Sequence, residues 1–531
     1  MDEFDFVVVG AGSAGGPLVD RLTESGRYSV LLLEAGPNDT SRWISMPLGF
    51  AKTFLDPAVN WKYVTAPEPR LDGRRIYWPR GKVVGGSSAI NGMVYIRGLP
   101  SDYDGWRQMG NEGWSFDDCL PYFKRLESYP GGETDLHGGN GPVKITQGEY
   151  RNELSDSFLA ACAEVGLQAT DDFNGASQEG AGYYHATISS GRRNSTGRAY
   201  IAEARKRPNC RVITDAMAER ILVENGRATG IAYRTNGESR TARARREVVL
   251  CSGAIGSPQL LQLSGIGPGA LLSQLGIPVV RDVPGVGENL QDHWGVRSTY
   301  RTWWRLTIND DINMMHRRVS AAVEYILMKT GPLTASPAFA GAFTRLMPQS
   351  AEADTQFHFF PWSTDRIDRG PHKFSGFTIL ANQSRPESRG HVRVVSRNPE
   401  DHPEIVANYL STANDQNAAV AAIKFTRVLS RTPALSRIIT EELLPGSEAW
   451  TDGDFLDYAK REGQSAYHPV GTCRMGHNAD CVVDPQLRVH GIERLRVADG
   501  SIMPTLVSGN TNAACMMIGE KAADLILADA R

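Results

Sequence analysis

A glycine pattern directly after the first apolar segment constrains this chain more than any other feature. Residues 6–9 are Phe-Val-Val-Val, and they run straight into Gly10-Ala-Gly12-Ser-Ala-Gly15. An apolar run that ends in Gly-x-Gly-x-x-Gly predicts a buried parallel strand that turns tightly into a helix. The first glycine permits the turn, the second lets a pyrophosphate approach the backbone, and the third lets helix and strand pack closely. The N–H groups and partial positive charge of the helix N-terminus then favour a bound phosphate.

A second apolar run makes a dinucleotide site more specific than a tight turn that binds nothing. Residues 30–33 are Val-Leu-Leu-Leu, and Glu34 follows them. A carboxylate at this place would accept hydrogen bonds from ribose hydroxyl groups. It disfavours a 2′-phosphate and therefore NADP, whereas FAD and NAD both remain possible. The motif predicts cofactor contacts at Gly10, Gly12, Ser13, Ala14, Gly15, Glu34 and Ala35.

Length and composition exclude several classes of protein. The 531 residues predict two or three domains, and the net charge of −3 without a basic stripe argues against a nucleic-acid partner. No apolar run reaches the roughly 18 residues of a membrane span. The acidic N-terminus lacks the basic start and apolar segment of a signal peptide, so we expect a cytoplasmic protein. Seven scattered cysteines fit a reducing compartment and give no disulfide framework.

Nucleotide-binding segments recur along the chain, which predicts a discontinuous domain. Residues 210–223 are typical of two successive strands, and 246–250 form another apolar strand. A helix is expected to begin near Pro258, because proline favours the first helical turn. A strand at 495–497 and a long helix over 513–528 follow near the end. The predicted fold is α/β (α+β overall), with a Rossmann-like domain made of residues 1–155, 205–295 and 465–531.

The region between these segments has a different character. Aromatic residues concentrate in 296–464, and 357–359 and 391–395 are typical of strands in a more antiparallel sheet. Residues 417–431 predict an amphipathic helix. We expect a substrate-binding domain of residues 156–204 and 296–464, built on a largely antiparallel sheet with helices. Its aromatic side chains could line a substrate pocket, but core packing is the favoured interpretation for most of them.

Three further segments give a specific resemblance. They are Gly85-Gly-Ser-Ser-Ala-Ile-Asn-Gly92, Gly253-Ala-Ile-Gly-Ser-Pro-Gln-Leu-Leu, and His468-Pro-Val-Gly-Thr-Cys-Arg-Met-Gly with a later Gly509-Asn-Thr-Asn512. Over essentially the whole chain, the sequence resembles the glucose-methanol-choline (GMC) oxidoreductases. Within them it resembles the branch of choline dehydrogenase and the bacterial alcohol and sorbose dehydrogenases. The resemblance implies a Rossmann-like FAD-binding domain, FAD rather than NAD, and oxidation of an alcohol to a carbonyl by hydride transfer to the flavin.

The resemblance also implies two catalytic residues. His468 corresponds to the proton acceptor, a role that suits histidine because its unperturbed pKa is about 6.5. Asn510 corresponds to the partner that hydrogen-bonds the same substrate oxygen. Asn512 is the competing choice, but the family's second catalytic residue lies ten positions before a glutamate, here Glu520. Outside these motifs, His468 could simply cap a turn and Asn510 could lie in a surface loop.

Cofactor and substrate contacts follow from the same resemblance. Some members attach FAD covalently through a histidine, and Ile90 stands at the matching position, so we expect noncovalent FAD. The substrate pocket is predicted to include Phe360, Trp362, Ala466 and Tyr467. Further cofactor contacts are predicted at Gly85, Ser88, Asn91, Gly92, Met93, Ala218, Asp499, Gly500, Asn510 and Thr511.

Other readings of the sequence remain open. His468, Cys473, His477 and Cys481 mimic a spaced zinc site, but a metal would occupy the proton acceptor, so no metal is predicted. A hydroxynitrile lyase of the same family, a non-catalytic flavin-binding module and an NAD enzyme are the alternative functions. Electrons could pass to a quinone, a dye or O₂. No carboxylate is placed to hold a quaternary ammonium, which makes choline a doubtful substrate, and the protein is expected to be a monomer or homodimer.

Overall fold

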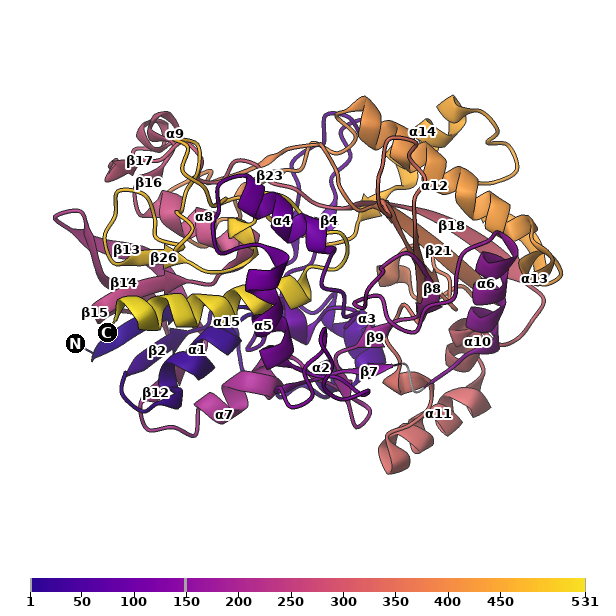
Figure 1. The fold of residues 1–531 in the computed structure, drawn as a ribbon, viewed down its shortest axis with the longest axis horizontal. Coiled ribbons are helices and arrows are strands. Elements are labelled where there is room, and N and C mark those ends of the chain that lie inside the picture. Colours follow the sequence, from indigo (N-terminus) through magenta and orange to yellow (C-terminus); the bar gives the residue numbers. More distant parts are fainter. Residues whose placement is uncertain (1, 148–149, 531) are drawn as a thin grey trace.

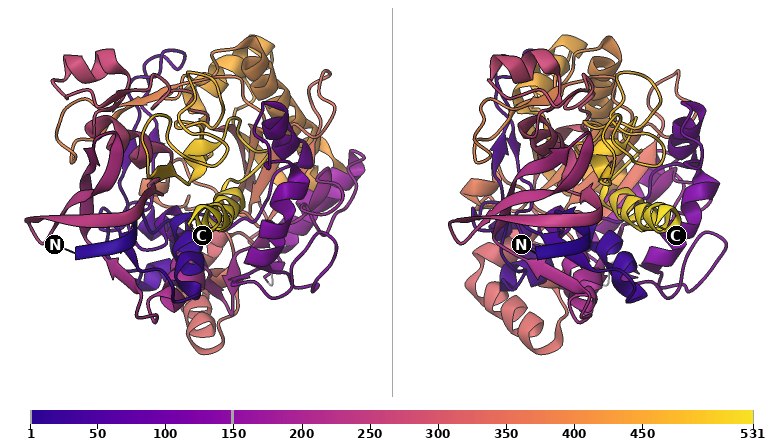
Figure 2. Two further views of the ribbon diagram at one scale, coloured as in Figure 1. Left: turned by 60° about the vertical axis from the view of Figure 1, so that its left-hand side comes forward. Right: turned by 90° about the vertical axis from the view of Figure 1, so that its left-hand side faces the viewer.

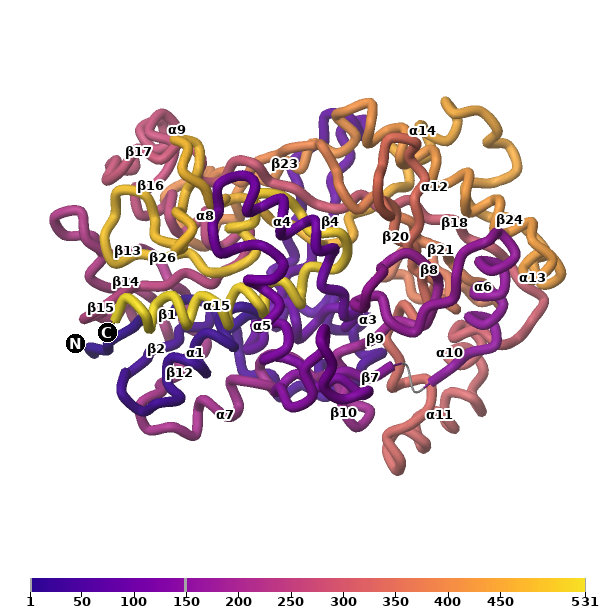
Figure 3. The backbone as a smooth tube through the Cα atoms, in the orientation of Figure 1, coloured from indigo at the N-terminus to yellow at the C-terminus, as the bar shows by residue number. Residues whose placement is uncertain are grey.

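Two seven-stranded sheets organise the protein, and they lie side by side in Figure 1. The computed structural model describes residues 2–147 and 150–530. The tube in Figure 3 shows that each sheet gathers segments far apart in the sequence: indigo, magenta and yellow in one, purple to orange in the other. The predicted class, mixed helices and sheets with a Rossmann-like part and an antiparallel part, is confirmed. The domain boundaries stay a prediction.

The first sheet is built on parallel strands that are buried on both faces. Val7 in the first strand pairs with Leu31 on one side and Val248 on the other. Residues 6–9 and 30–33 are fully or almost fully buried, which explains their continuous apolar sequence. The strand order is β12 (Cys210–Ile213), β2 (Val30–Leu33), β1 (Asp2–Val9), β15 (Glu238–Leu250), β14 (Arg227–Thr235) and β13 (Ala216–Glu224), with β26 (Leu495–Val497) beside β15.

Helices cover the first sheet and direct their N-termini to one region. α1 (Gly15–Glu24) and α15 (Asn512–Asp529) pack against each other, and α15 is the long yellow helix of Figure 1. The helix predicted near Pro258 is α8 (Gly253–Leu263), which begins five residues earlier than expected. Pro258 has no N–H to donate to the carbonyl of Ala254, and the Thr472 hydroxyl donates to that carbonyl instead, at 2.7 Å. The helix therefore continues through its proline.

The second sheet is antiparallel throughout. Its strand order is β24 (Ile439–Leu444), β18 (Trp294–Thr302), β21 (Gly376–Gln383), β20 (Thr355–Phe360), β19 (Ala340–Thr344) and β8 (Gly180–Tyr183), with β25 (Gln464–Ser465) beside β18. α6 (Glu153–Glu164) and α12 (Ala413–Arg431) cover one face. Phe357 and Phe359 are buried in the core under these helices. Since side chains alternate along a strand, His358 and Phe360 lie on the other face.

Two predictions for this region need correction. Residues 391–395 do not join the second sheet: β22 (His391–Arg393) pairs with β23 (Glu404–Val406) in a separate two-stranded sheet. The helix predicted over 417–431 begins at Ala413, because Thr412 caps it by accepting a hydrogen bond from the backbone of Asp415. The aromatic residues also divide, since Trp303 is 60% exposed whereas Phe357 and Phe359 are core.

Among the described residues, the remaining α-helices of five or more residues are α4 (Pro100–Gln108), α5 (Phe116–Leu126), α9 (Gly269–Gln274), α10 (Ile308–Asn313), α11 (Met315–Met328) and α14 (Asp452–Glu462). The shorter helices are α2 (Arg42–Ser45), α3 (Phe50–Thr53), α7 (Ala202–Ala204) and α13 (Pro433–Ser436). Strands outside the two large sheets include β3 (Tyr63–Val64), β4 (Tyr77–Trp78), β10 (Ile188–Ser189) and β11 (Arg192–Arg193). The two turned views in Figure 2 show α11, in salmon, at the lower edge of the molecule.

Candidate active site

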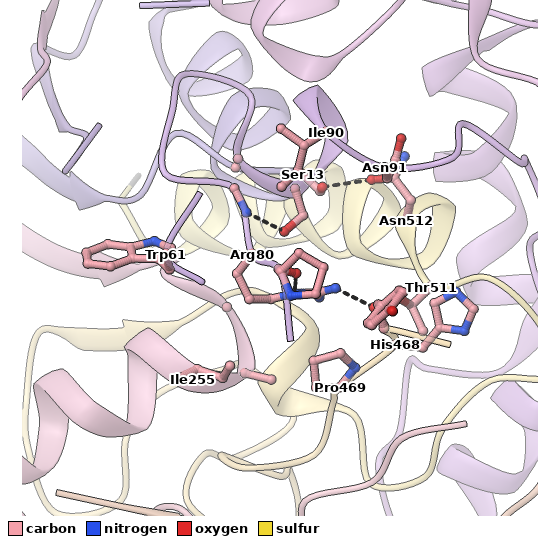
Figure 4. Close-up of a pocket in the computed structure, with 18 of the residues that line it drawn as sticks. Ser13, Trp61, Arg80, Ile90, Asn91, Ile255, His468, Pro469, Thr511 and Asn512 are labelled. Carbon is pink, nitrogen blue, oxygen red and sulfur yellow. Dashed lines mark hydrogen bonds between the residues drawn. The ribbon is translucent and has the colours of Figure 1, made fainter. Parts of the chain in front are cut away.

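A cavity of about 420 Å³ lies between the two sheets and brings most of the predicted site residues together. Figure 4 shows part of its wall, with side chains from distant parts of the chain around one space. Nineteen of the predicted residues line it. They are Gly10, Gly12, Ser13, Ala14, Glu34, Ala35, Asn91, Gly92, Met93, Ala218, Phe360, Trp362, Ala466, Tyr467, His468, Asp499, Gly500, Asn510 and Thr511.

Three predicted cofactor residues lie behind the cavity wall instead. A Cβ on Gly15 would come within 2.0 Å of the Gly10 carbonyl oxygen, so this glycine serves close helix–strand packing. Gly85 has a φ of +94°, and the Ser88 hydroxyl donates to its carbonyl at 2.6 Å. The neighbouring residues Gly86 and Ser87 line the cavity. Gly85 and Ser88 therefore shape the loop that presents these neighbours.

One end of the cavity fits the adenosine part of a dinucleotide. The buried Glu34 carboxylate accepts hydrogen bonds from the backbone N–H groups of Ala11, at 2.9 Å, and Gly36, at 3.0 Å. Burial raises the pKa of Glu34 to about 7. A Cβ on Gly10 would lie 2.4 Å from the Cys251 carbonyl oxygen, whereas a Cβ on Gly12 would meet nothing closer than 3.9 Å. The second glycine thus leaves open space beside the backbone, as a pyrophosphate requires.

Three helix N-termini open onto the same cavity. Residues at the starts of α1, α8 and α15 line it: Ser13 and Ala14, Gly253 and Ala254, Thr511 and Asn512. The Ser13 hydroxyl donates to Asn512 at 2.7 Å, which joins two of these ends (Figure 4). Helix N-termini favour anions through their free N–H groups and dipoles. The residues present therefore fit the two phosphates of a dinucleotide.

The opposite end of the cavity holds the predicted catalytic pair. The Asn510 side-chain N–H donates to Nε2 of His468 at 3.1 Å. The oxygen of the same amide accepts a hydrogen bond from Gln356 at 3.0 Å, which fixes the orientation of Asn510. Gln356 belongs to β20 and lies on the same face as His358 and Phe360. The second sheet thus orients a residue that the chain places near its C-terminus.

A chain of hydrogen bonds defines which nitrogen of His468 carries the proton. Nε2 of His293 lies 2.9 Å from the carbonyl oxygen of Ser384, which can only accept, so this Nε2 carries hydrogen. The Nδ1 of neutral His293 is then an acceptor, and Nδ1 of His468, 2.9 Å away, must be the donor. Nε2 of neutral His468 therefore presents a lone pair beside Asn510.

The surroundings keep His468 neutral. Burial lowers its pKa well below the usual value, and the neighbouring His293, His358 and Arg80 act in the same direction. Burial also lowers the pKa of His293 to about 4, so both members of the pair are uncharged near neutral pH. A neutral imidazole at the cavity wall, with its Nε2 lone pair beside Asn510, can accept a proton from a bound hydroxyl.

Backbone contacts hold the histidine in place. The Asp292 carboxylate accepts a hydrogen bond from the His468 backbone N–H at 2.7 Å and also contacts Tyr409 and Ser465. Arg80 donates to the Tyr467 carbonyl oxygen at 2.5 Å. Tyr467 has a φ of +66°, a strained value for a residue with a side chain. These contacts maintain that strained conformation directly before His468.

Sequence reasoning missed several residues of this site. Arg80, Gln356 and His358 line or support the cavity without belonging to a recognised motif. His293 also belongs to the site, because its Nδ1 contacts Nδ1 of His468. Alternation along 355–360 could have separated Gln356, His358 and Phe360 from the buried Phe357 and Phe359. The aromatic residues on both faces of this strand conceal the alternation in the sequence.

The residues that mimic a zinc site do not form one. Within residues 2–147 and 150–530, no group of three or more His, Cys, Asp or Glu side chains could hold a metal ion. His477 donates to the Gly110 carbonyl at 3.2 Å, outside the cavity that His468 lines.

Several known proteins are similar to this chain. The oxygen-dependent choline dehydrogenase of Vibrio vulnificus is 42% identical over 531 residues, covering 99% of this chain and 95% of the relative. Pyridoxine 4-oxidase from Mesorbium loti has a TM-score of 0.88 at 30% identity, covering 98% of each chain. An FAD-dependent oxidoreductase from Chaetomium thermophilum has a TM-score of 0.91 at 27% identity, covering 99% of this chain and 100% of that one.

Family models match both halves of the sequence. The N-terminal model of the GMC oxidoreductases covers residues 4–295, and the C-terminal model covers 386–519. These matches and the full-length relatives confirm the predicted family and enzyme class, and the predicted FAD agrees with a relative named for it. The chain belongs to the GMC oxidoreductase family.

Proposed function

We propose that the protein oxidises an alcohol to an aldehyde or ketone, with His468 as the proton acceptor and noncovalently bound FAD as the cofactor. The observation that carries this proposal is the fixed tautomer of His468. Its Nε2 lone pair faces the Asn510 amide at the cavity wall, with His293 and Ser384 behind it. A base and a hydrogen-bond donor side by side suit a hydroxyl group, which gives up one proton and accepts one hydrogen bond.

The nucleotide end of the cavity would hold the ADP part of FAD. Glu34 would accept from the ribose hydroxyls, and the starts of α1, α8 and α15 would surround the phosphates. When bound, FAD supplies the acceptor for the hydride that leaves the alcohol carbon. Ile90 lines the cavity, and residues 80–100 contain no histidine for a covalent bond. Acid precipitation should therefore release the yellow colour from the protein.

The protein's own residues then handle the proton. The alcohol hydroxyl would donate to Nε2 of His468 and accept from the Asn510 amide, whose oxygen Gln356 already holds. After proton transfer, the imidazolium keeps its Nδ1–H bond to the acceptor nitrogen of neutral His293. The strained Tyr467 and the Asp292 carboxylate keep the ring in position throughout.

The cavity favours an uncharged alcohol with an apolar body. Three carboxylates line it among the described residues, and Glu34 and Asp499 already accept backbone N–H bonds at the nucleotide end. The third, Asp365, is 65% exposed and pairs with His372 at 3.0 Å. Arg80 and Arg297 also line the cavity, so a quaternary ammonium would lose its hydration without gaining a buried counter-ion. Phe360 and Trp362 offer apolar surface to a neutral substrate.

An anaerobic titration tests the function. An alcohol substrate should bleach the flavin absorbance of the wild-type enzyme without oxygen, whereas a lyase would leave the oxidised spectrum. His468→Ala should keep its FAD and slow turnover by about 10²–10⁴-fold. Unchanged turnover in this variant would remove His468 from the mechanism. A dye or quinone should accept the electrons faster than O₂, as expected of a dehydrogenase.

Two isosteric alcohols test the substrate. Choline is the substrate named for the Vibrio relative, and 3,3-dimethylbutan-1-ol replaces its trimethylammonium by an uncharged tert-butyl group. We expect kcat/KM to favour the uncharged alcohol by at least about tenfold, equivalent to about 1.4 kcal/mol. A preference for choline would contradict the uncharged substrate and leave the flavin chemistry untouched.

A further inference from the structure

Helix α11 carries an apolar face that points into solvent. Ala321 and Tyr325 on one side of the helix are buried against the protein. The opposite side repeats apolar residues at helical spacing, and these side chains are exposed. We call this set the α11 stripe: Met315 (66% exposed), Val319 (53%), Val323 (49%), Ile326 (67%) and Leu327 (75%). Single exposed apolar residues are ordinary, but a contiguous row on one face marks a contact surface.

The stripe projects from the molecule rather than lining a groove. In Figure 1 and in both views of Figure 2, α11 stands out at the lower edge. The chain on either side of it leads to the cavity wall. Before α11, Asn309 in α10 donates to the carbonyl of Ser363, next to the cavity-lining Thr364. After it, Pro337 lines the cavity. The stripe therefore lies on the part of the protein that also builds the cavity.

Basic side chains flank the stripe. His316 and Arg318 are exposed on α11, and the Arg318 guanidinium reaches the sulfur of Met315 at 3.2 Å, alongside the apolar row. The hairpin of β10 and β11 packs against the end of the helix and carries the exposed Arg192. Lys329 follows the last turn. The chain as a whole carries a net charge of −3, so this basic rim is a local feature.

Two acidic residues lie near the stripe. Asp311 pairs with Arg317 at 3.6 Å. Glu324 accepts a hydrogen bond from the Thr330 hydroxyl at 2.9 Å. Four basic residues, Arg192, Arg317, Arg318 and Lys329, stand against two acidic residues, Asp311 and Glu324, beside the stripe. This surface is therefore cationic as well as apolar, which is the pattern of a helix that lies in the interface of an anionic bilayer.

We propose that α11 docks the protein onto an anionic lipid surface, with the stripe among the acyl chains and Arg318 and Arg192 at the headgroups. The helix has 14 residues, about 21 Å of length, which suits a position in the plane of the interface. None of the helices among the described residues is long and apolar enough to cross a bilayer. A second copy of the chain fits less well, because a stable protein interface uses about 20–30 residues on each side.

Vesicle sedimentation tests the proposal with purified, FAD-loaded enzyme. Wild type should sediment with vesicles of phosphatidylcholine and phosphatidylglycerol, and less with phosphatidylcholine alone. Replacing both Ile326 and Leu327 by serine should lower the partition coefficient roughly tenfold on the anionic vesicles. Arg318→Gln should lower it about fivefold there, because one charge near an anionic surface contributes about 1 kcal/mol.

A matched control separates docking from general surface effects. Val428→Ser removes an apolar side chain that is 50% exposed on α12, and should bind vesicles like wild type. All variants should keep their FAD and their alcohol turnover with a dye in solution, since none of these residues lines the cavity. Equal vesicle binding by wild type and the I326S/L327S variant would overturn the proposal. So would a concentration-dependent dimer, seen by sedimentation velocity, that only this variant loses.

Discussion

At the scale of single residues, His293 defines the tautomer of His468, the proposed catalytic base, without lining the cavity. It accepts from Nδ1 of His468 and donates to the Ser384 carbonyl. An acceptor at this place keeps the His468 lone pair on Nε2, where a substrate hydroxyl can reach it. We therefore regard His293 as a positioning residue whose side-chain chemistry, rather than its size, matters for turnover.

Two substitutions of His293 test whether its hydrogen bonds or its size matter for turnover. His293→Leu removes the acceptor, so we expect kcat to fall roughly 10²-fold while FAD content stays the same. His293→Asn can still offer an oxygen to His468 and an N–H to Ser384, and should recover most of the lost rate. Steady-state kinetics with a dye acceptor, with FAD measured by absorbance, checks both variants. Equal losses in the two would assign His293 a purely structural role.

The motifs predict which residues share the cavity far better than which residues support them. His468 and Asn510 could be paired from the sequence because each stands in a recognisable segment. His293 and Gln356 could not be added, because their contacts depend on how β18 and β20 meet the C-terminal segment. Gly15 and Ser88 belong to the recognised motifs, yet they pack behind the wall rather than lining the cavity. Spacing along the chain cannot show whether a motif residue lines the cavity or packs behind its wall.

At the scale of elements, α8 shows why helix boundaries are hard to predict. Proline normally stands in the first turn, which suggested a start near Pro258. The helix instead begins at Gly253, since the hydroxyl of Thr472, far along the chain, satisfies the Ala254 carbonyl that the proline leaves free. The strands at 30–33 and 495–497 and the helix over 513–528 were predicted to within one residue, whereas the strand predicted over 246–250 begins eight residues earlier, at Glu238. The start of α8 could not be predicted in this way, because it depends on a hydrogen bond from a distant part of the chain.

This hydrogen bond should contribute measurably to stability. Thr472→Val leaves the Ala254 carbonyl unsatisfied in a buried place, which should cost about 1–3 kcal/mol of unfolding free energy. Thr472→Ser keeps the hydroxyl and should cost less. Adding Pro258→Ala to Thr472→Val restores an N–H that can reach the Ala254 carbonyl, so the double variant should regain part of the loss. Urea denaturation of the FAD-loaded proteins measures all three, and an additive double variant would contradict this account.

At the scale of the whole molecule, buried carboxyl groups and buried histidines make opposite contributions to the dependence of stability on pH. Burial raises the pKa of Glu34 to about 7 and of Asp292 to about 6, so the folded state binds their protons more readily than the unfolded chain. These two groups favour folding as the pH falls below 7. Burial lowers the pKa of His293 to about 4 and of His358 to about 3, which has the opposite effect below pH 6.5. The two contributions oppose each other over the same range.

Removing one histidine should therefore expose its contribution. His358 lines the cavity, and its Nδ1 has no hydrogen-bond partner among the described residues. Its depressed pKa means that wild type loses stability through this group as the pH falls below the unfolded value of about 6.5, by roughly 2 kcal/mol at pH 5. Relative to wild type, His358→Gln should thus gain about that much in unfolding free energy between pH 8 and pH 5.

Urea denaturation at both pH values measures this difference in unfolding free energy, and His316→Gln, which replaces an exposed histidine on α11, is the control. A His358→Gln difference that stays constant with pH would show that His358 takes up its proton equally in both states, and the buried neutral histidine would have to be abandoned.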